Sequence, residues 1–158
     1  MRTFDGKGEF FYEDRLVYSG SWWRGKYHGK GTFYFKDGAT FCGDFFSGMM
    51  HGRGTFMWSK GDTYEGEWRT GKMHGQGRKQ MANGDMYEGQ WEEDYGHGHA
   101  EYRYAETGAV YRGQWVKDKK QGKGRLRWAS GSLYVGKWDS NDVHGNGKFT
   151  YACGSTYT

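Results

Sequence analysis

The chain has 158 residues, a net charge of +4 and a mean hydropathy of −1.06, and it contains 29 glycines and no proline. Glycine averages about 7% in soluble domains, so this content could indicate a flexible segment, but aromatic residues make up 20% of the chain. Disordered chains are poor in aromatic residues, so composition excludes simple disorder, and the lack of a long apolar run excludes a transmembrane helix.

The N-terminal residues, MRTFDGKGEF, lack the apolar core of a secretory signal. The two cysteines, Cys42 and Cys153, are too few for a disulfide framework. Since equivalent residues of a hairpin array move about 10 Å per hairpin, these two cysteines are also too far apart to pair within one extended chain. We therefore expect a cytoplasmic protein.

One pattern of residues recurs along the whole chain. It opens on an aromatic residue, followed by glycine two positions later and a second aromatic four positions later, and the opening residues lie 23 or 24 apart: Tyr18, Phe41, Tyr64, Tyr87, Tyr111, Tyr134 and Tyr157. Such a period is typical of a repeat architecture. We expect one continuous array over 1–158, with a partial unit at 1–17, units at 18–40, 41–63, 64–86, 87–110, 111–133 and 134–156, and a further start at 157–158.

Each unit is predicted to form a β-hairpin. In the third unit, Tyr64, Gly66 and Trp68 alternate and so share one face of a first strand. Gly71 marks the hairpin turn, and the other units place Gly25, Gly48, Asp94, Asp118 or Asn141 there. A second strand follows, and a second turn ends on Gly84 and its equivalents. The extra residue of the fourth unit falls in this second turn.

Glycine is unfavourable inside strands, so its regular recurrence needs a compensating gain. Rows of glycine leave room for aromatic rings from neighbouring strands to lie on the backbone, and ring pairs add roughly 0.5–1.5 kcal/mol each. The prediction is an all-β fold without helices: an elongated, single-layer, solenoid-like twisted sheet of antiparallel hairpins in which neighbours complete each other's packing.

The stretch YEGEWRTGKMHGQG (64–77) resembles the MORN (membrane occupation and recognition nexus) repeat, whose consensus is close to YxGxWxxGxxHGxG. The resemblance covers essentially the whole chain. Departures include Phe41 and Phe45 in the second unit, Ala100 in the fourth and Gln121 in the fifth. The resemblance implies an elongated β array used as a scaffold in membrane-associated, cytoskeletal and signalling proteins, sometimes beside catalytic domains.

Catalytic and metal sites are not expected. Every conspicuous polar residue is a periodic one, and no unit contains a singular group of nucleophile, base and orienting residue. The motif histidines belong to different units, too far apart to share a zinc ion. His97 and His99 lie on one strand face and are a weak metal candidate, and Cys153 and His144 are candidates only between two chains. No cofactor is expected.

Three sets of residues are candidate binding surfaces. An aromatic partner surface is predicted at Tyr64, Trp68, Tyr87, Trp91, Tyr111, Trp115, Tyr134 and Trp138. A site for anionic headgroups is predicted in the basic fifth unit, at Lys117, Lys119, Lys120, Lys123, Arg125 and Arg127, although a simple solvated rim is an equally good interpretation. A dimer interface is predicted at Trp128, Tyr134, Trp138, Tyr151, Cys153 and Tyr157.

These observations favour a non-enzymatic scaffold that forms an antiparallel homodimer through its C-terminal repeats. The acidic fourth unit beside the basic fifth suits a two-fold contact, because opposite charges would then meet across the axis. Cytoskeletal or scaffold proteins are the expected partners, at cytoskeletal or membrane-associated structures. The alternative is a membrane-targeting module that binds phosphoinositides or other anionic lipids. Nucleic acid is not expected, because the basic residues form no continuous stripe.

Overall fold

The computed structural model describes residues 4–158, which form two compact units divided between Gly77 and Arg78. Within residues 4–158 there is no helix, and the all-β prediction is confirmed. The strands that lie wholly in the first unit are β1 (Gly6–Tyr12), β2 (Arg15–Trp23), β3 (Lys26–Tyr34), β4 (Thr40–Phe46), β5 (Met49–Met57) and β6 (Thr63–Arg69). The strand β7 (Lys72–Gln80) contains the division.

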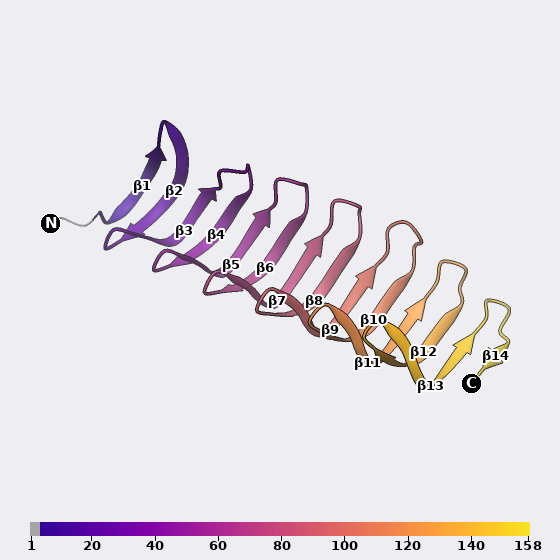
Figure 1. The fold of residues 1–158 in the computed structure, drawn as a ribbon. Helices are drawn as coiled ribbons and strands as arrows, with labels where there is room; N and C mark the ends of the chain where they lie inside the picture. The colour runs from indigo at the N-terminus through magenta and orange to yellow at the C-terminus, as the bar shows by residue number, and fades with distance from the viewer. Residues whose placement is uncertain (1–3) are drawn as a thin grey trace. The chain divides into compact units, whose positions relative to one another are not determined.

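The second unit contains the remaining strands: β8 (Met86–Glu92), β9 (Tyr95–Arg103), β10 (Val110–Val116), β11 (Lys119–Arg127), β12 (Leu133–Asp139), β13 (Asp142–Thr150) and the short β14 (Thr156–Tyr157). Within each unit the strands follow one another in chain order in an antiparallel sheet, so strands that are neighbours in the sequence are also neighbours in space (Figure 1). A sheet of consecutive hairpins is what the 23-residue period predicted.

The hairpin turns are two-residue turns in which both residues have positive φ. Thr70 has a φ of 48° and Gly71 a φ of 82°, and the pair Lys117 and Asp118 has values of 47° and 63°. Positive φ at both positions is the signature of a type I′ turn, whose twist matches that of the flanking strands. The sequence pattern identified the second turn position and missed the first, because the first carries residues with no preference for positive φ.

Several hairpin turns are also hydrogen-bonded to the hairpin before them. The amide of Gly48 donates to the carbonyl of Tyr27 at 2.9 Å, and the amide of Asn141 donates to the carbonyl of Lys120 at 3.1 Å. Where asparagine replaces glycine, its side chain adds a second bond: the Lys120 amide donates to Asn141 Oδ1 at 2.9 Å. The departures from turn glycine therefore add a contact to the neighbouring hairpin.

The second strand of the repeat hairpins contains a bulge at the glycine after the motif histidine. The register shifts at this place between Gly113 and Gln114 on β10, and Gly122 on the facing strand has a φ of 65°. Gly113 faces Gly124 but Gln114 faces Gln121, so β11 has two extra residues here, and the bulge needs a left-handed conformation that glycine adopts without strain. Gly122 is therefore needed for the backbone conformation of the bulge, whereas Gly124, two positions later, leaves space for the Tyr111 ring.

The connecting turns between hairpins have a regular hydrogen bond that closes on glycine. The Gly84 amide donates to the Met81 carbonyl, three residues back, at 2.9 Å, whereas the Gly108 amide reaches the Tyr104 carbonyl, four residues back. The extra residue of the fourth repeat is thus absorbed in the turn between β9 and β10, where it leaves the strand register unchanged.

Candidate binding surface

The opening aromatic of each repeat lies on bare backbone, as the sequence predicted. A Cβ on Gly124 would come within 2.3 Å of Tyr111 Oη, and one on Gly31 within 2.2 Å of Tyr18 Oη. The Tyr111 hydroxyl donates to the carbonyl of Gln114 at 3.1 Å, so its burial leaves no polar atom unpaired. A glycine at these places is therefore a requirement of ring packing.

The tryptophan four residues later packs edge-on against this ring. Tyrosine–tryptophan pairs such as Tyr64 with Trp68 and Tyr111 with Trp115 have centroids 5.2 and 5.3 Å apart, with rings close to perpendicular. The eight residues of the predicted aromatic partner surface are all buried, with at most 6% of each exposed. Their rings form the core of the repeats, so they are not themselves accessible to a partner. A partner would contact the exposed side chains at the edges of the repeats and on the opposite face of the sheet.

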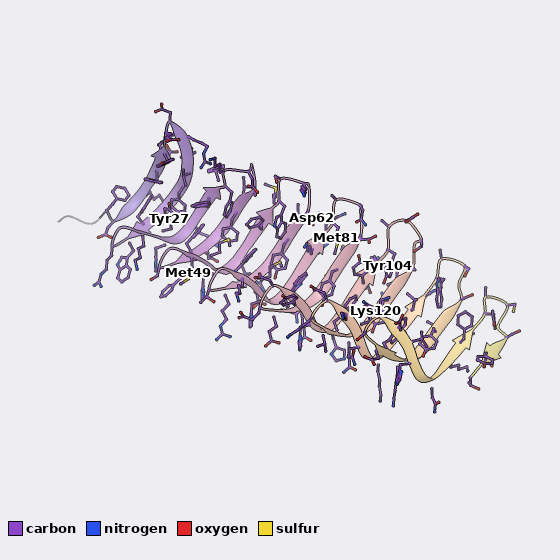
Figure 2. The ribbon with its side chains drawn as sticks, viewed as in Figure 1. Tyr27, Met49, Asp62, Met81, Tyr104 and Lys120 are labelled. Atoms are coloured by element: carbon purple, nitrogen blue, oxygen red, sulfur yellow. The ribbon has the colours of Figure 1, made fainter. Side chains whose placement is uncertain are left out.

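The predicted headgroup residues do not share one surface. The side chain of Lys120 lies on the ring-bearing face, with Nζ 4.9 Å from the ring centroid of Trp138, 5.2 Å from that of Tyr104 and 5.3 Å from that of Tyr111; Tyr104 and Lys120 are labelled in Figure 2. Lys117 occupies a hairpin turn and Lys119 begins β11. Lys123, Arg125 and Arg127 alternate with the ring-bearing positions and so lie on the opposite, polar face.

The polar face of β10 to β12 carries cations that face each other across strands. Arg112 is directly opposite Arg125, and Lys123 is directly opposite Lys137. Side chains and backbone of these strands line an open hollow of about 400 Å³, formed by Arg112, Lys123, Gly124, Arg125, Val135, Gly136, Lys137 and Asn146. Lys137 was not among the predicted site residues, because it lies in the next repeat and reaches this cluster only through the β11–β12 pairing.

The acidic Glu101 borders this cluster on the β9 side. Glu101 lies opposite Arg112 in the sheet and forms ion pairs with Arg112 and with Arg103, the latter at 2.6 Å. Partial burial raises the pKa of the Glu101 carboxyl, but the hydrogen bonds and charges of the two arginines outweigh it, so the pKa lies below its ordinary value. A second hollow, lined by His99, Ala100, Glu101, Arg112 and Gly113, adjoins the first.

The first unit pairs opposite charges at the places that correspond to Lys123 and Lys137. Lys30 faces Asp44 and is ion-paired with it at 2.7 Å, and Arg53 faces Glu67. Partial burial raises the pKa of Asp44, but the hydrogen bond and charge of Lys30 and the Arg53 amide lower it below its ordinary value. The ring-bearing face is thus similar in all repeats, whereas the polar face changes its chemistry from repeat to repeat.

The predicted dimer residues fall into two groups. Tyr134 and Trp138 are buried in the core, whereas Tyr151 is 50% exposed and Tyr157 is 72% exposed. Trp128 is half-buried and packs on Phe149, with ring centroids 5.4 Å apart, and Phe149 in turn packs on Tyr151. The last hairpin therefore carries accessible aromatic surface.

Cysteine and histidine are dispersed. Cys42 and Cys153 are both exposed free thiols. A hydrogen bond with Ser155 lowers the pKa of the Cys153 thiol. Within residues 4–158, no three side chains of histidine, cysteine, aspartate or glutamate come together in a way that could hold a metal ion. The exposed His144 and Cys153 remain predicted metal ligands only between two chains.

Comparison with known proteins agrees with the repeat seen in the fold. The family model for the MORN repeat matches residues 18–40, 41–63, 64–86, 87–106, 111–133 and 134–156. The chain belongs to the MORN repeat family. MORN repeats are a non-enzymatic repeat type found in scaffold and membrane-associated proteins. No helix within residues 4–158 has the length and apolar character needed to cross a membrane.

No curated protein sequence matches this MORN protein. Among solved structures, one match is described as the SAS-4 (dCPAP) TCP domain in complex with a proline-rich motif of Ana2 (dSTIL) of Drosophila melanogaster. The sequences are 17% identical, the TM-score is 0.38, and the match covers 66% of this chain and 70% of that chain.

Proposed function

We propose that this MORN protein is a non-enzymatic scaffold that self-associates and binds protein partners in the cytoplasm, at cytoskeletal or membrane-associated structures. One observation carries the proposal: the ring-bearing face repeats, while the polar face differs at equivalent places, from Lys30 opposite Asp44 to Lys123 opposite Lys137. A constant core with a variable exposed face suits a protein whose repeats present different surfaces to different partners.

The last hairpin is the proposed self-association surface. Exposed aromatic side chains gain most from burial at an interface. Tyr151 and Tyr157 are accessible, and both adjoin Phe149, which packs on Trp128. An antiparallel homodimer would bury these rings on both copies through one two-fold contact. The buried Tyr134 and Trp138 would support this surface from beneath.

Multi-angle light scattering over a range of protein concentrations tests this surface. The chain is expected to approach twice its monomer mass as concentration rises, and the double variant Tyr151→Ser with Tyr157→Ser is expected to stay monomeric. Tyr12→Ser is the matched control, because Tyr12 is 60% exposed in β1. A wild-type chain that remains monomeric at all concentrations would contradict self-association.

Binding of anionic phospholipids is the second candidate function. It is favoured by the cations that share the polar face of β11, which are Lys123, Arg125 and Arg127. Surface binding to membranes usually also inserts apolar side chains, and the hollow beside these cations offers only Val135. Sedimentation with phosphoinositide-containing vesicles, compared between wild type and Lys123→Glu, separates this function from the scaffold.

A further inference from the structure

The cations of the polar face between β10 and β12 are arranged against the usual rule for strand pairs. Arg112 faces Arg125 and Lys123 faces Lys137, and like charges directly opposite each other destabilise a sheet. The places of the first unit that correspond to Lys123 and Lys137 hold Lys30 with Asp44 and Arg53 with Glu67 in register, so the repeat can accommodate opposite charges there. Local rules are broken most often at functional sites.

The repulsion is only partly neutralised within the chain. Arg112 shares the Glu101 carboxylate with Arg103. Among residues 4–158, the side chains of Lys123, Arg125 and Lys137 form no ion pair, and all three are exposed. Three cations and a partly neutralised arginine thus surround one open hollow of about 400 Å³. An anion seated among them would relieve the repulsion and gain charge-assisted hydrogen bonds.

The spacing of the cations indicates the shape of that anion. Cross-strand neighbours such as Arg112 and Arg125 lie about 4.8 Å apart at the backbone, and Arg125 lies about 6.8 Å along β11 from Lys123. An extended polypeptide presents alternate side chains at that same spacing of about 6.8 Å. Two carboxylates at alternate positions of a bound segment would each meet a pair of cations.

We infer that this hollow, between β10 and β13, is a docking site for an extended acidic segment of a partner protein. The inference rests on the proposed scaffold function, for which it names the chemistry of one partner. Val135 and Asn146 line the hollow beside the cations and provide one apolar contact and one amide for the segment's backbone. A membrane is the less suitable occupant, because no exposed ring or long aliphatic side chain lines this hollow.

Fluorescence anisotropy with a labelled oligoglutamate peptide tests the inference on the full chain. Lys137→Glu is the decisive variant, because it creates at this place the opposite-charge pairing that Arg53 and Glu67 have. It is expected to weaken peptide binding by about tenfold or more and to raise the melting temperature by roughly 2 °C. Loss of binding together with gain of stability would not result from a purely structural residue.

Two further variants complete the experiment. Lys137→Gln removes the charge without reversing it, and an intermediate loss of binding is expected. Lys26→Glu changes the net charge as much as Lys137→Glu does, but Lys26 begins β3 in the first unit, and its peptide affinity is expected to remain within about twofold of wild type. Raising the ionic strength should weaken binding, because the cations are exposed.

Three results would overturn the inference. These are no binding of oligoglutamate at low ionic strength, equal losses in Lys26→Glu and Lys137→Glu, or binding of phosphatidylserine vesicles that depends on Lys137 while the peptide does not bind. The last result would assign the hollow to a membrane surface. Light scattering of Lys137→Glu keeps this test separate from the scaffold proposal, since an unchanged mass leaves self-association intact whatever the peptide does.

Discussion

The ring of Tyr87 lies over the backbone of Gly96, where an added Cβ would come within 2.8 Å of the ring. In the other repeats the opening ring is seated on the second glycine of the GxG pair, such as Gly124. The fourth repeat has Ala100 at that place, and a Cβ on the facing Gly89 would meet the Ala100 methyl group at 2.4 Å. Gly96 therefore compensates for Ala100, because the Tyr87 ring packs on the Gly96 backbone instead of at position 100.

This relationship predicts strong coupling between Gly96 and Ala100. Gly96→Met introduces the residue found at the equivalent Met73 and should destabilise the protein by about 1–3 kcal/mol, because the added side chain overlaps the Tyr87 ring. Combining it with Ala100→Gly should recover much of that loss, since the ring regains its usual seat. Urea unfolding of both single variants and the double variant measures the coupling, and strictly additive effects would contradict the compensation.

The first position of the β6–β7 hairpin turn is predicted to be strained. Thr70 has a φ of 48°, and a β-branched residue in the left-handed region costs roughly 1–2 kcal/mol. Thr70→Asn should stabilise the protein by about 1 kcal/mol, because asparagine tolerates this conformation and is favoured in type I′ turns. Thermal unfolding measures the change. Thr63→Asn, in β6 with an extended backbone, is the control and should not stabilise.

Acid is predicted to weaken the second unit through Glu101. Partial burial raises the pKa of Glu101, but Arg112 and Arg103 lower it more, so the folded pKa lies below the ordinary value of 4.5. A carboxyl whose pKa is lowered by folding contributes stability above its unfolded pKa and loses it as pH falls through the folded value. Glu101→Gln should remove this pH-dependent part and cost about 0.2–1 kcal/mol at neutral pH, as measured by urea unfolding at several pH values.

Alkali is predicted to act through the buried tyrosines. Burial, reinforced by the neighbouring Tyr27, raises the pKa of Tyr18 from 10.0 to about 12, and burial next to Tyr104 does the same for Tyr111. Because these raised values favour the protonated folded state, their contribution to stability is present below pH 10 and is lost as pH rises towards 12. Ultraviolet titration should show a class of tyrosines that ionise at higher pH than the others. In urea, all tyrosines should ionise together.

Tyr111→Phe provides the control for the alkaline prediction. Phe41 occupies the equivalent place in the second repeat and is fully buried, so the ring itself should fit. The lost hydrogen bond to the Gln114 carbonyl should cost about 1 kcal/mol at neutral pH. The variant should then lose less stability between neutral and alkaline pH than the wild type, and an equal loss would assign the alkaline transition to other groups.

The sequence predicted the hairpins, the ring-bearing face and the purpose of the GxG glycine because these depend on contacts that every repeat makes again. The prediction assigned Lys120 and Lys123 to one site because it grouped the basic residues of the unit by charge. They lie three residues apart on β11, so strand alternation places them on opposite faces of the sheet. Lys137 joined the site only through the pairing of β12 with β11, a long-range relation that spacing alone did not reveal.

The hydrogen bond from a hairpin turn to the preceding hairpin, such as that from Gly48 to Tyr27, joins two main-chain groups. The step from one hairpin to the next is therefore dictated by the peptide group, which every amino acid possesses, and is largely independent of the outward-facing side chains. A whole repeat can therefore be duplicated, deleted or exchanged during evolution without disturbing these hydrogen bonds on either side. Recombination of whole repeats can then generate new combinations of docking sites on the same backbone framework.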